Sequence, residues 1–149
     1  MDSHTPTNWG TVTPYLAVEG AQGMIDFLQT VFDAQVIEKI PGEGGQIMHS
    51  ELKIGSSMIM LADACDKAPA TRVALYVYVP NVDATYQKAL GAGAASESEP
   101  KDQFYGDRSA GVIDKWDNRW WIATHIEDVS SEEMQRRMEE WKQKSQEQA

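Results

Sequence analysis

The chain has 149 residues, of which 42% are hydrophobic and 24% are charged, a composition typical of a globular protein with a proper core. Its formal charge of -10 repels nucleic-acid phosphates and favours a cationic or neutral ligand. No apolar run reaches the length of a membrane span, and no signal-peptide pattern is present near the start. Cys65 is the only cysteine, so no internal disulfide forms and a cytoplasmic location is expected.

The first half of the chain predicts one strand, one helix and three further strands. The segment 11–18 is typical of a strand, and apolar residues at helical spacing over 21–32 indicate a helix. Glycine-containing turns then separate three extended runs, which cover residues 34–40, 46–54 and 57–61. The predicted order is therefore β-α-β-β-β.

The second half repeats this order. A strand over 73–79 precedes a helix over 82–90. The turns of two hairpins also correspond, with Gly55-Ser56 matching Asp117-Asn118. The matched segments are the strand ends 16–18 and 77–79 and the hairpins 51–61 and 112–122. They lie about 60 residues apart, which indicates one internal duplication, since repeat arrays need at least ~3 copies of a shorter unit.

The duplicated body is expected to form one domain over residues 11–128, made of modules 11–62 and 72–128. Residues 129–149 are predicted to form a C-terminal helix and tail. Ser130 and Glu133 have the spacing of a helix-capping pair, and an apolar stripe follows at helical spacing. This stripe, which we expect to cover the body or a partner subunit, contains Met134, Met138 and Trp141.

Two tandem β-α-β-β-β modules resemble the glyoxalase, bleomycin-resistance and extradiol-dioxygenase superfamily, also called vicinal oxygen chelate. More narrowly, the motifs His-Ser-Glu-Leu-Lys-Ile-Gly at 49–55, Tyr-Gly-Asp-Arg at 105–108, Arg-Trp at 119–120 and the segment 123–130 resemble a bacterial branch usually named after a phosphonate-operon protein. The resemblance implies an α+β fold in which the two modules form a glyoxalase-like cleft. It also implies a homodimer.

Enzymes of this superfamily hold a divalent metal on one ligand from each of four strands. By register, the resemblance places these positions at Thr13, Glu51, Ala74 and Trp121. Only Glu51 offers a good metal ligand, because alanine and tryptophan supply no oxygen or imidazole donor and threonine is a poor one. We therefore expect no metal or other cofactor. A rearranged site that uses Glu51 with His49, with or without His125, is the alternative.

Strand alternation predicts which side chains line the cleft, because residues two apart share a face. The expected cleft residues are Thr13, Tyr15, His49, Glu51, Tyr76, Tyr78, Arg119, Trp121 and His125, together with the short side chains Ala17, Ala74 and Ala123. The opposite faces, expected to pack under the helices, carry Val12, Leu16, Val18, Leu52, Ile54, Leu75, Val77, Val79, Trp120 and Ile122. A ligand pocket with an aromatic wall is one interpretation. Ordinary cross-strand packing of tyrosines is the other.

Two pairs of neighbouring polar residues are candidates for chemistry. Glu51 beside His49 has the composition of a general acid and base, although a hydrogen-bonded pair at the cleft edge is equally consistent with the spacing. Asp107 and Arg108 either present a guanidinium to an anionic substrate or bridge each other locally. We expect the local bridge, because both partners are adjacent.

The favoured function is a small-molecule binding protein of this superfamily, metal-free, that holds a ligand in its aromatic cleft. A cationic aromatic ligand gains cation-π contacts with Tyr76, Tyr78 and Trp121, while Glu51 balances its charge. The alternative is a divalent-metal-dependent lyase, isomerase or dioxygenase of the same superfamily, with Glu51 as ligand or base. A third possibility is an interaction module whose cleft is filled by its own side chains.

Overall fold

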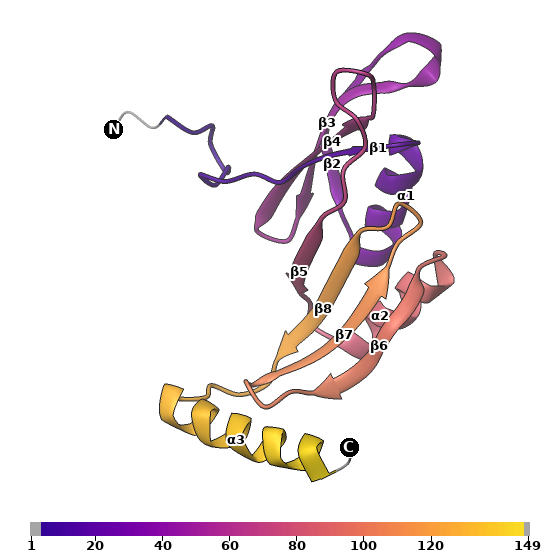
Figure 1. Cartoon of the computed structure of the whole chain (residues 1–149). Helices are drawn as coiled ribbons and strands as arrows, with labels where there is room; N and C mark the ends of the chain where they lie inside the picture. The colour runs from indigo at the N-terminus through magenta and orange to yellow at the C-terminus, as the bar shows by residue number, and fades with distance from the viewer. Residues whose placement is uncertain (1–3, 148–149) are drawn as a thin grey trace.

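The computed structural model describes residues 4–147 and contains two modules in the predicted order (Figure 1). The first consists of β1 (Tyr15–Val18), α1 (Ala21–Phe32), β2 (Gln35–Pro41), a 3-10 turn at Glu43–Gly45, β3 (Ile47–Ile54) and β4 (Ser57–Asp63). The second consists of β5 (Ala74–Tyr78), α2 (Val82–Gly91), β6 (Ala95–Asp102), β7 (Asp107–Ile113) and β8 (Arg119–His125). The helix α3 (Ser131–Glu147) follows.

Each module forms a four-stranded mixed sheet with the same topology. The strand order is β1-β4-β3-β2 in the first sheet and β5-β8-β7-β6 in the second. In each, the first strand pairs in parallel with the last, and the remaining pairs are antiparallel. The predicted α+β fold of tandem β-α-β-β-β modules is thus confirmed.

The helices α1 and α2 lie on the same side of the two sheets (Figure 1) and contact each other. Their apolar faces share one continuous core with the strands. Trp120 of β8 is fully buried and contacts the rings of Phe27 and Phe32 on α1. The first module's helix therefore packs directly on the second module's sheet.

The start of each helix is held by a side chain from the last strand of its own sheet. The Asp63 carboxylate at the end of β4 accepts hydrogen bonds from the backbone N–H groups of Gly20 and Ala21. At the end of β8, the Thr124 hydroxyl accepts one from the N–H of Val82. Because the first turn of a helix leaves N–H groups without partners, these two equivalent residues fix where each helix meets its sheet.

The first strand is shorter than predicted. It begins at Tyr15, because Pro14 has no N–H group and the ladder to β4 starts only with the bond from the Met60 N–H to the Pro14 carbonyl. Val12, predicted to face the core, lies before the strand and is 86% exposed. The remaining predicted core positions of the strands are buried or pack against the core.

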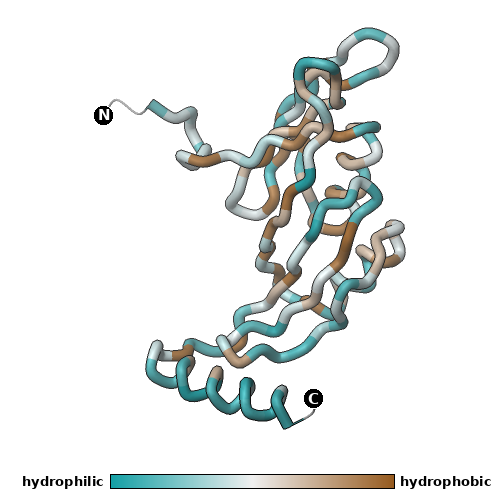
Figure 2. Tube along the Cα trace, viewed as in Figure 1, coloured by the Kyte–Doolittle hydropathy of each residue, from teal (hydrophilic) through white to brown (hydrophobic). Residues whose placement is uncertain are grey.

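The C-terminal helix is almost entirely hydrophilic (Figure 2). Its predicted cap is present, since the Ser130 hydroxyl accepts a hydrogen bond from the Glu133 N–H. Its apolar stripe is predicted to cover the body or a partner subunit, and the first of these alternatives is wrong. No residue of α3 is buried, and Trp141 is 53% exposed although its ring contacts Phe104 of the body. Residues 148 and 149 of the predicted tail lie outside the described part of the chain. Within residues 4–147, no helix combines the length and apolar character needed to cross a membrane.

Candidate functional site

The sheet faces that point away from α1 and α2 carry most of the predicted site residues. Alternation along the strands places Tyr15, Tyr76 and Tyr78 there, and their side chains are 49%, 42% and 62% exposed. Trp121 is half-buried, whereas Arg119 and His125 are exposed. Ala17 and Ala123 are buried, so these two predicted positions add no accessible surface.

On the first sheet, three predicted residues meet in what we call the first cluster: Tyr15, His49 and Glu51. The Tyr15 hydroxyl lies 3.4 Å from Nδ1 of His49, and Nε2 of His49 lies 3.5 Å from the Glu51 carboxylate. The predicted contact between the histidine and the glutamate is therefore present. Both distances are long for hydrogen bonds, so this cluster is loosely held.

On the second sheet, the carboxylate of Asp107 gathers three side chains into a second cluster: Tyr76, Tyr78, Asp107 and His125. The hydroxyls of Tyr76 and Tyr78 donate to one carboxylate oxygen at 2.7 and 3.0 Å. Nδ1 of His125 lies 2.8 Å from the other oxygen. Asp107 is only 4% exposed, so a buried charge stands behind the exposed tyrosine rings.

The hydrogen bonds of the second cluster decide its charge state. Burial acts to raise the pKa of Asp107, but the hydrogen bonds from His125, Tyr76 and Tyr78 outweigh it and leave the pKa below its usual value. The bonds to Asp107 and then to Asp128 raise the pKa of His125. Asp107 is accordingly an anion that accepts hydrogen bonds and donates none.

Trp121 lies flat on the second sheet because its cross-strand neighbour is Gly111. A Cβ atom at Gly111 would approach the indole Cζ3 to 2.7 Å, so any larger residue displaces the ring. The guanidinium of Arg119 lies 5.8 Å from the indole centroid, and its Nε forms an ion pair with the Glu97 carboxylate at 2.6 Å. A cation-π contact is thus already made within the chain.

The predicted bridge between Asp107 and Arg108 is wrong. Adjacent residues of a strand point to opposite faces, so Asp107 faces the tyrosines while Arg108 faces away. Arg108 instead forms ion pairs with Asp83 at 2.8 Å and Asp102 at 3.0 Å. Its guanidinium ties β7 to the start of α2.

The structure does not bring all predicted residues together. No hydrogen bond or ion pair within residues 4–147 joins the first cluster to the second. A groove of about 940 Å³ lies between the modules, next to the edge strand β5. Of the predicted cleft residues it reaches Thr13, Tyr76 and Tyr78, and its other polar lining includes Lys53, Thr85 and Lys88.

The residues present do not fit the metal site that the superfamily uses. Glu51 is the only strong donor at the four positions, and its nearest titratable neighbour is His49. Among the described residues, no group of three or more His, Cys, Asp and Glu side chains gathers closely enough to hold an ion. His125, considered for a rearranged site, pairs with Asp107 and Asp128 on the other sheet.

Sequence reasoning missed the role of Asp107. The signal was present in the hairpin of β7 and β8, whose turn spans Asp114 to Asn118 and is closed by the bond from the Asp114 N–H to the Asn118 carbonyl. Counting outward from that turn pairs Asp107 with His125. The sequence pattern predicts a shorter turn at Asp117 and Asn118. That turn shifts the pairing of β7 with β8, so Asp107 and His125 are no longer opposite each other.

Two kinds of relative are similar to the chain over most of its length. An uncharacterized protein of Mycobacterium bovis is 31% identical over 138 residues, which cover 85% of this chain and 91% of that protein. Among solved structures, TioX from Micromonospora sp. ML1 has a TM-score of 0.65 at 24% identity and covers 78% of this chain and 100% of that one. The fosfomycin resistance protein FosX from Listeria monocytogenes has a TM-score of 0.62 at 17% identity and covers 84% and 97%.

The two solved structures show a shared fold. A family model described as the Glyoxalase/Bleomycin resistance protein/Dioxygenase superfamily matches residues 10–122, which span both modules. The duplicated strand order and the paired sheets agree with that match. The chain therefore belongs to the glyoxalase/bleomycin resistance protein/dioxygenase superfamily.

Proposed function

We propose that this protein binds a small molecule on the aromatic sheet faces and does so without a metal. The observation that carries the proposal is the second cluster, in which two exposed tyrosine rings stand over a buried carboxylate. Tyr76 and Tyr78 lie 5.3 Å apart at their ring centroids and form a continuous apolar surface with a polar edge. Exposed aromatic rings with a few fixed polar groups are typical of small-molecule sites.

The metal-free part of the proposal is supported by the donor set. Elemental analysis of the untagged protein, before and after incubation with nickel, zinc, manganese or iron(II) and dialysis, tests it directly. We expect no retained ion. Retention of about one ion per chain, lost in Glu51→Ala, would overturn this part and would favour a metal-dependent enzyme instead.

The binding part of the proposal is tested at Trp121. Trp121→Ala removes a large stacking surface without touching the Asp107 hydrogen bonds, and we expect it to weaken binding of an aromatic ligand at least about tenfold. Trp116→Ala is the matched control, because Trp116 lies at the module junction and donates to the Glu19 carbonyl. A dissociation constant unchanged by Trp121→Ala contradicts the aromatic site.

A metal-dependent lyase, isomerase or dioxygenase is the second candidate function. The contact between His49 and Glu51 at 3.5 Å favours it, since such a pair can move a proton. The fosfomycin resistance protein of Listeria monocytogenes is described in complex with Mn(II), at 16% identity to this chain. The metal-free binding protein remains the favoured function, because Glu51 is the only strong metal donor at the four superfamily positions.

Three further parts of the proposal concern the setting of the protein. We place it in the phosphonate-operon-type branch on the motifs at 49–55 and 105–108, and in the cytoplasm. We also propose a homodimer, on the resemblance of the two tandem modules to the superfamily. Sedimentation equilibrium measures the mass, and a monomer across the micromolar range contradicts the dimer.

A further inference from the structure

The hydrogen-bond donors of the second cluster are all engaged within the chain. Tyr76 and Tyr78 each direct their single hydroxyl proton at the Asp107 carboxylate. His125 places Nδ1 against Asp107 and Nε2 against Asp128 at 2.7 Å. What the cluster offers to a ligand is therefore the lone pairs of the phenol oxygens.

We propose that Asp107 sets the ligand specificity of this site by fixing the direction of the Tyr76 and Tyr78 protons, so that the ligand must carry an ammonium or amide N–H donor facing the phenols. This inference rests on the proposed binding function and names the ligand class. Asp107 acts as a positioning residue, since its buried carboxylate lies behind the tyrosine hydroxyls.

The direction of the hydroxyl protons follows from the charge of Asp107. An ionised carboxylate only accepts, and a phenol has one proton to give. Reversing either hydroxyl would leave a buried charge with one fewer donor, which costs several-fold more than turning a solvent-exposed hydroxyl. Asp107 is only 4% exposed, whereas Tyr78 is 62% exposed. The buried carboxylate therefore fixes the direction of the hydroxyl proton on the exposed ring.

The local charge favours the same ligand class. Facing the phenols are Asp107, His125 and, beyond it, Asp128, while Tyr105 lies beside Tyr76 and helps to raise its pKa. Two carboxylates outweigh one imidazole in either of its protonation states, so the net charge here is negative. The nearby Arg119 is neutralised by Glu97. A ligand cation at the phenols gains, whereas a carboxylate meets repulsion.

Three probes with one aromatic ring test this specificity. 2-Phenylethylamine and 3-phenylpropionate carry opposite charges on chains of equal length, and ethylbenzene is neutral and has no N–H group. By calorimetry at about 0.15 M salt, where charges beyond ~8 Å are screened, we expect 2-phenylethylamine to bind at least about fivefold tighter than 3-phenylpropionate. In Asp107→Asn, whose amide also donates, this ratio falls to about one.

The control variants separate the role of Asp107 from loss of charge and from loss of folding. Asp102→Asn removes the same charge from the neighbouring strand β6, where Asp102 forms an ion pair with Arg108. This variant is expected to keep the preference for the cationic probe over the anionic one. If Asp107→Asn does not fold, Tyr78→Phe keeps the exposed ring and is expected to weaken binding of 2-phenylethylamine but not of ethylbenzene. Preference for 3-phenylpropionate, or a full preference for 2-phenylethylamine in Asp107→Asn or in Tyr78→Phe, overturns the inference.

A ligand-free readout distinguishes failure of this inference from failure of the proposed function. The hydrogen bond to Asp107 raises the pKa of Tyr78, and burial followed by the same bond raises that of Tyr76. Absorbance at alkaline pH counts ionised tyrosines, and Asp107→Asn should ionise two of them at lower pH. If no probe binds the wild-type protein, the binding function fails. If the tyrosine titration is the same in both proteins, Asp107 does not direct the protons and the inference fails.

Discussion

The two modules share one backbone plan but differ at the equivalent positions of their open faces. In the first, Tyr15 and Glu51 both pair with Met60 of β4. In the second, Tyr76 and Gly111 both pair with Trp121 of β8. The duplication therefore keeps a tyrosine on the first strand of each module. The acidic position of the first module is a glycine in the second, and the space it leaves is filled by an indole ring.

This difference separates a loose polar face from a fixed aromatic one. The first cluster is held by contacts of 3.4 and 3.5 Å, whereas the bonds to Asp107 measure 2.7 to 3.0 Å. The side chains on the open face of each sheet do not pack in the core. Single substitutions there can therefore give the two duplicated faces different chemistry while the fold stays the same.

The largest expected effect lies where the modules differ on their buried side. Trp120 of β8 corresponds to Ile59 of β4, and only Trp120 reaches the rings of the other module's helix, with its indole N–H donating to buried Asp114 at 2.7 Å. We expect Trp120→Ala to lower the free energy of unfolding by about 3–5 kcal/mol. Ile59→Ala, measured by the same urea titration, should cost less. The opposite order contradicts the role of Trp120 in joining the modules.

Making the second face more like the first should have a moderate effect. Gly111→Ala brings a Cβ atom to 2.7 Å from Trp121 and 3.0 Å from the Ser98 hydroxyl, and we expect it to cost about 1–3 kcal/mol. Gly91→Ala is the control, because nothing lies within 4 Å of a Cβ there and alanine suits a helix better than glycine. Equal stability of the two variants would mean that the indole does not rest on the strand.

The histidine of the second cluster should make the stability of the protein depend on pH. Because the pKa of His125 is raised in the folded protein, its stabilisation is complete below an unfolded value of about 6.5 and is lost as pH rises through the folded value. Asp107, whose pKa is lowered, contributes above about 3.9 and loses its contribution only as pH falls through its folded value.

Thermal melting between about pH 6 and pH 9 measures this contribution. The wild-type protein should lose more stability over that range than His125→Gln does. His49→Gln is the control, because it removes a histidine but leaves the bonds from His125 to Asp107 and Asp128 in place, so the loss of stability that His125 causes should remain. A His125→Gln curve parallel to the wild type would show that the bonds to Asp107 and Asp128 do not hold the imidazolium.

Local patterns in the sequence were enough to predict the fold, because each module has a two-residue periodicity that separates buried from open faces. Leu16 and Leu52 are fully buried and Tyr78 is exposed, as alternation predicts. The contact between His49 and Glu51 was also accessible, since residues two apart on a strand are neighbours. These features depend on short spacings along one strand.

Features that depend on register between strands were not accessible in the same way. The second cluster joins β5, β7 and β8, and its centre depends on the length of the Asp114–Asn118 turn. The exposed stripe of α3 was missed for a related reason: helical spacing shows that an apolar face exists but not whether a surface is there to receive it. Long-range pairings and docking are tertiary properties, which a single segment does not specify.

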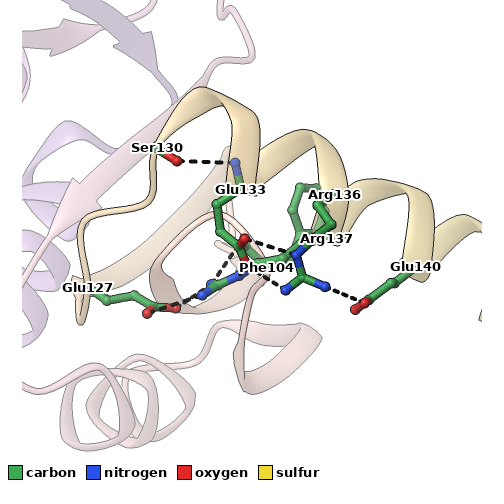
Figure 3. A network of polar contacts seen from close by, with 7 residues as sticks. All are labelled: Phe104, Glu127, Ser130, Glu133, Arg136, Arg137 and Glu140. Carbon is green, nitrogen blue, oxygen red and sulfur yellow. Dashed lines mark hydrogen bonds and ion pairs between the residues drawn. The ribbon is translucent and has the colours of Figure 1, made fainter.

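The smallest expected effect concerns α3, which has no counterpart in the first module. Arg137 ties it to the body through Glu127 and the Phe104 carbonyl, whereas within residues 4–147 the bonds of Arg136 go to Glu133 and Glu140 of the helix itself (Figure 3). The rings of Phe104 and Trp141 add a contact at 6.1 Å.

We expect Arg137→Ala to leave the melting temperature of the body unchanged and to speed hydrogen exchange over Ser131–Glu147. Exposed ion pairs contribute little to global stability, but a helix with no buried residue depends on its few anchors to stay in place. Arg136→Ala removes a guanidinium of the same kind without touching the body, so it should increase exchange less. Equal acceleration in both variants would mean that the ion pairs within the helix, and not its attachment to the second module, keep α3 ordered.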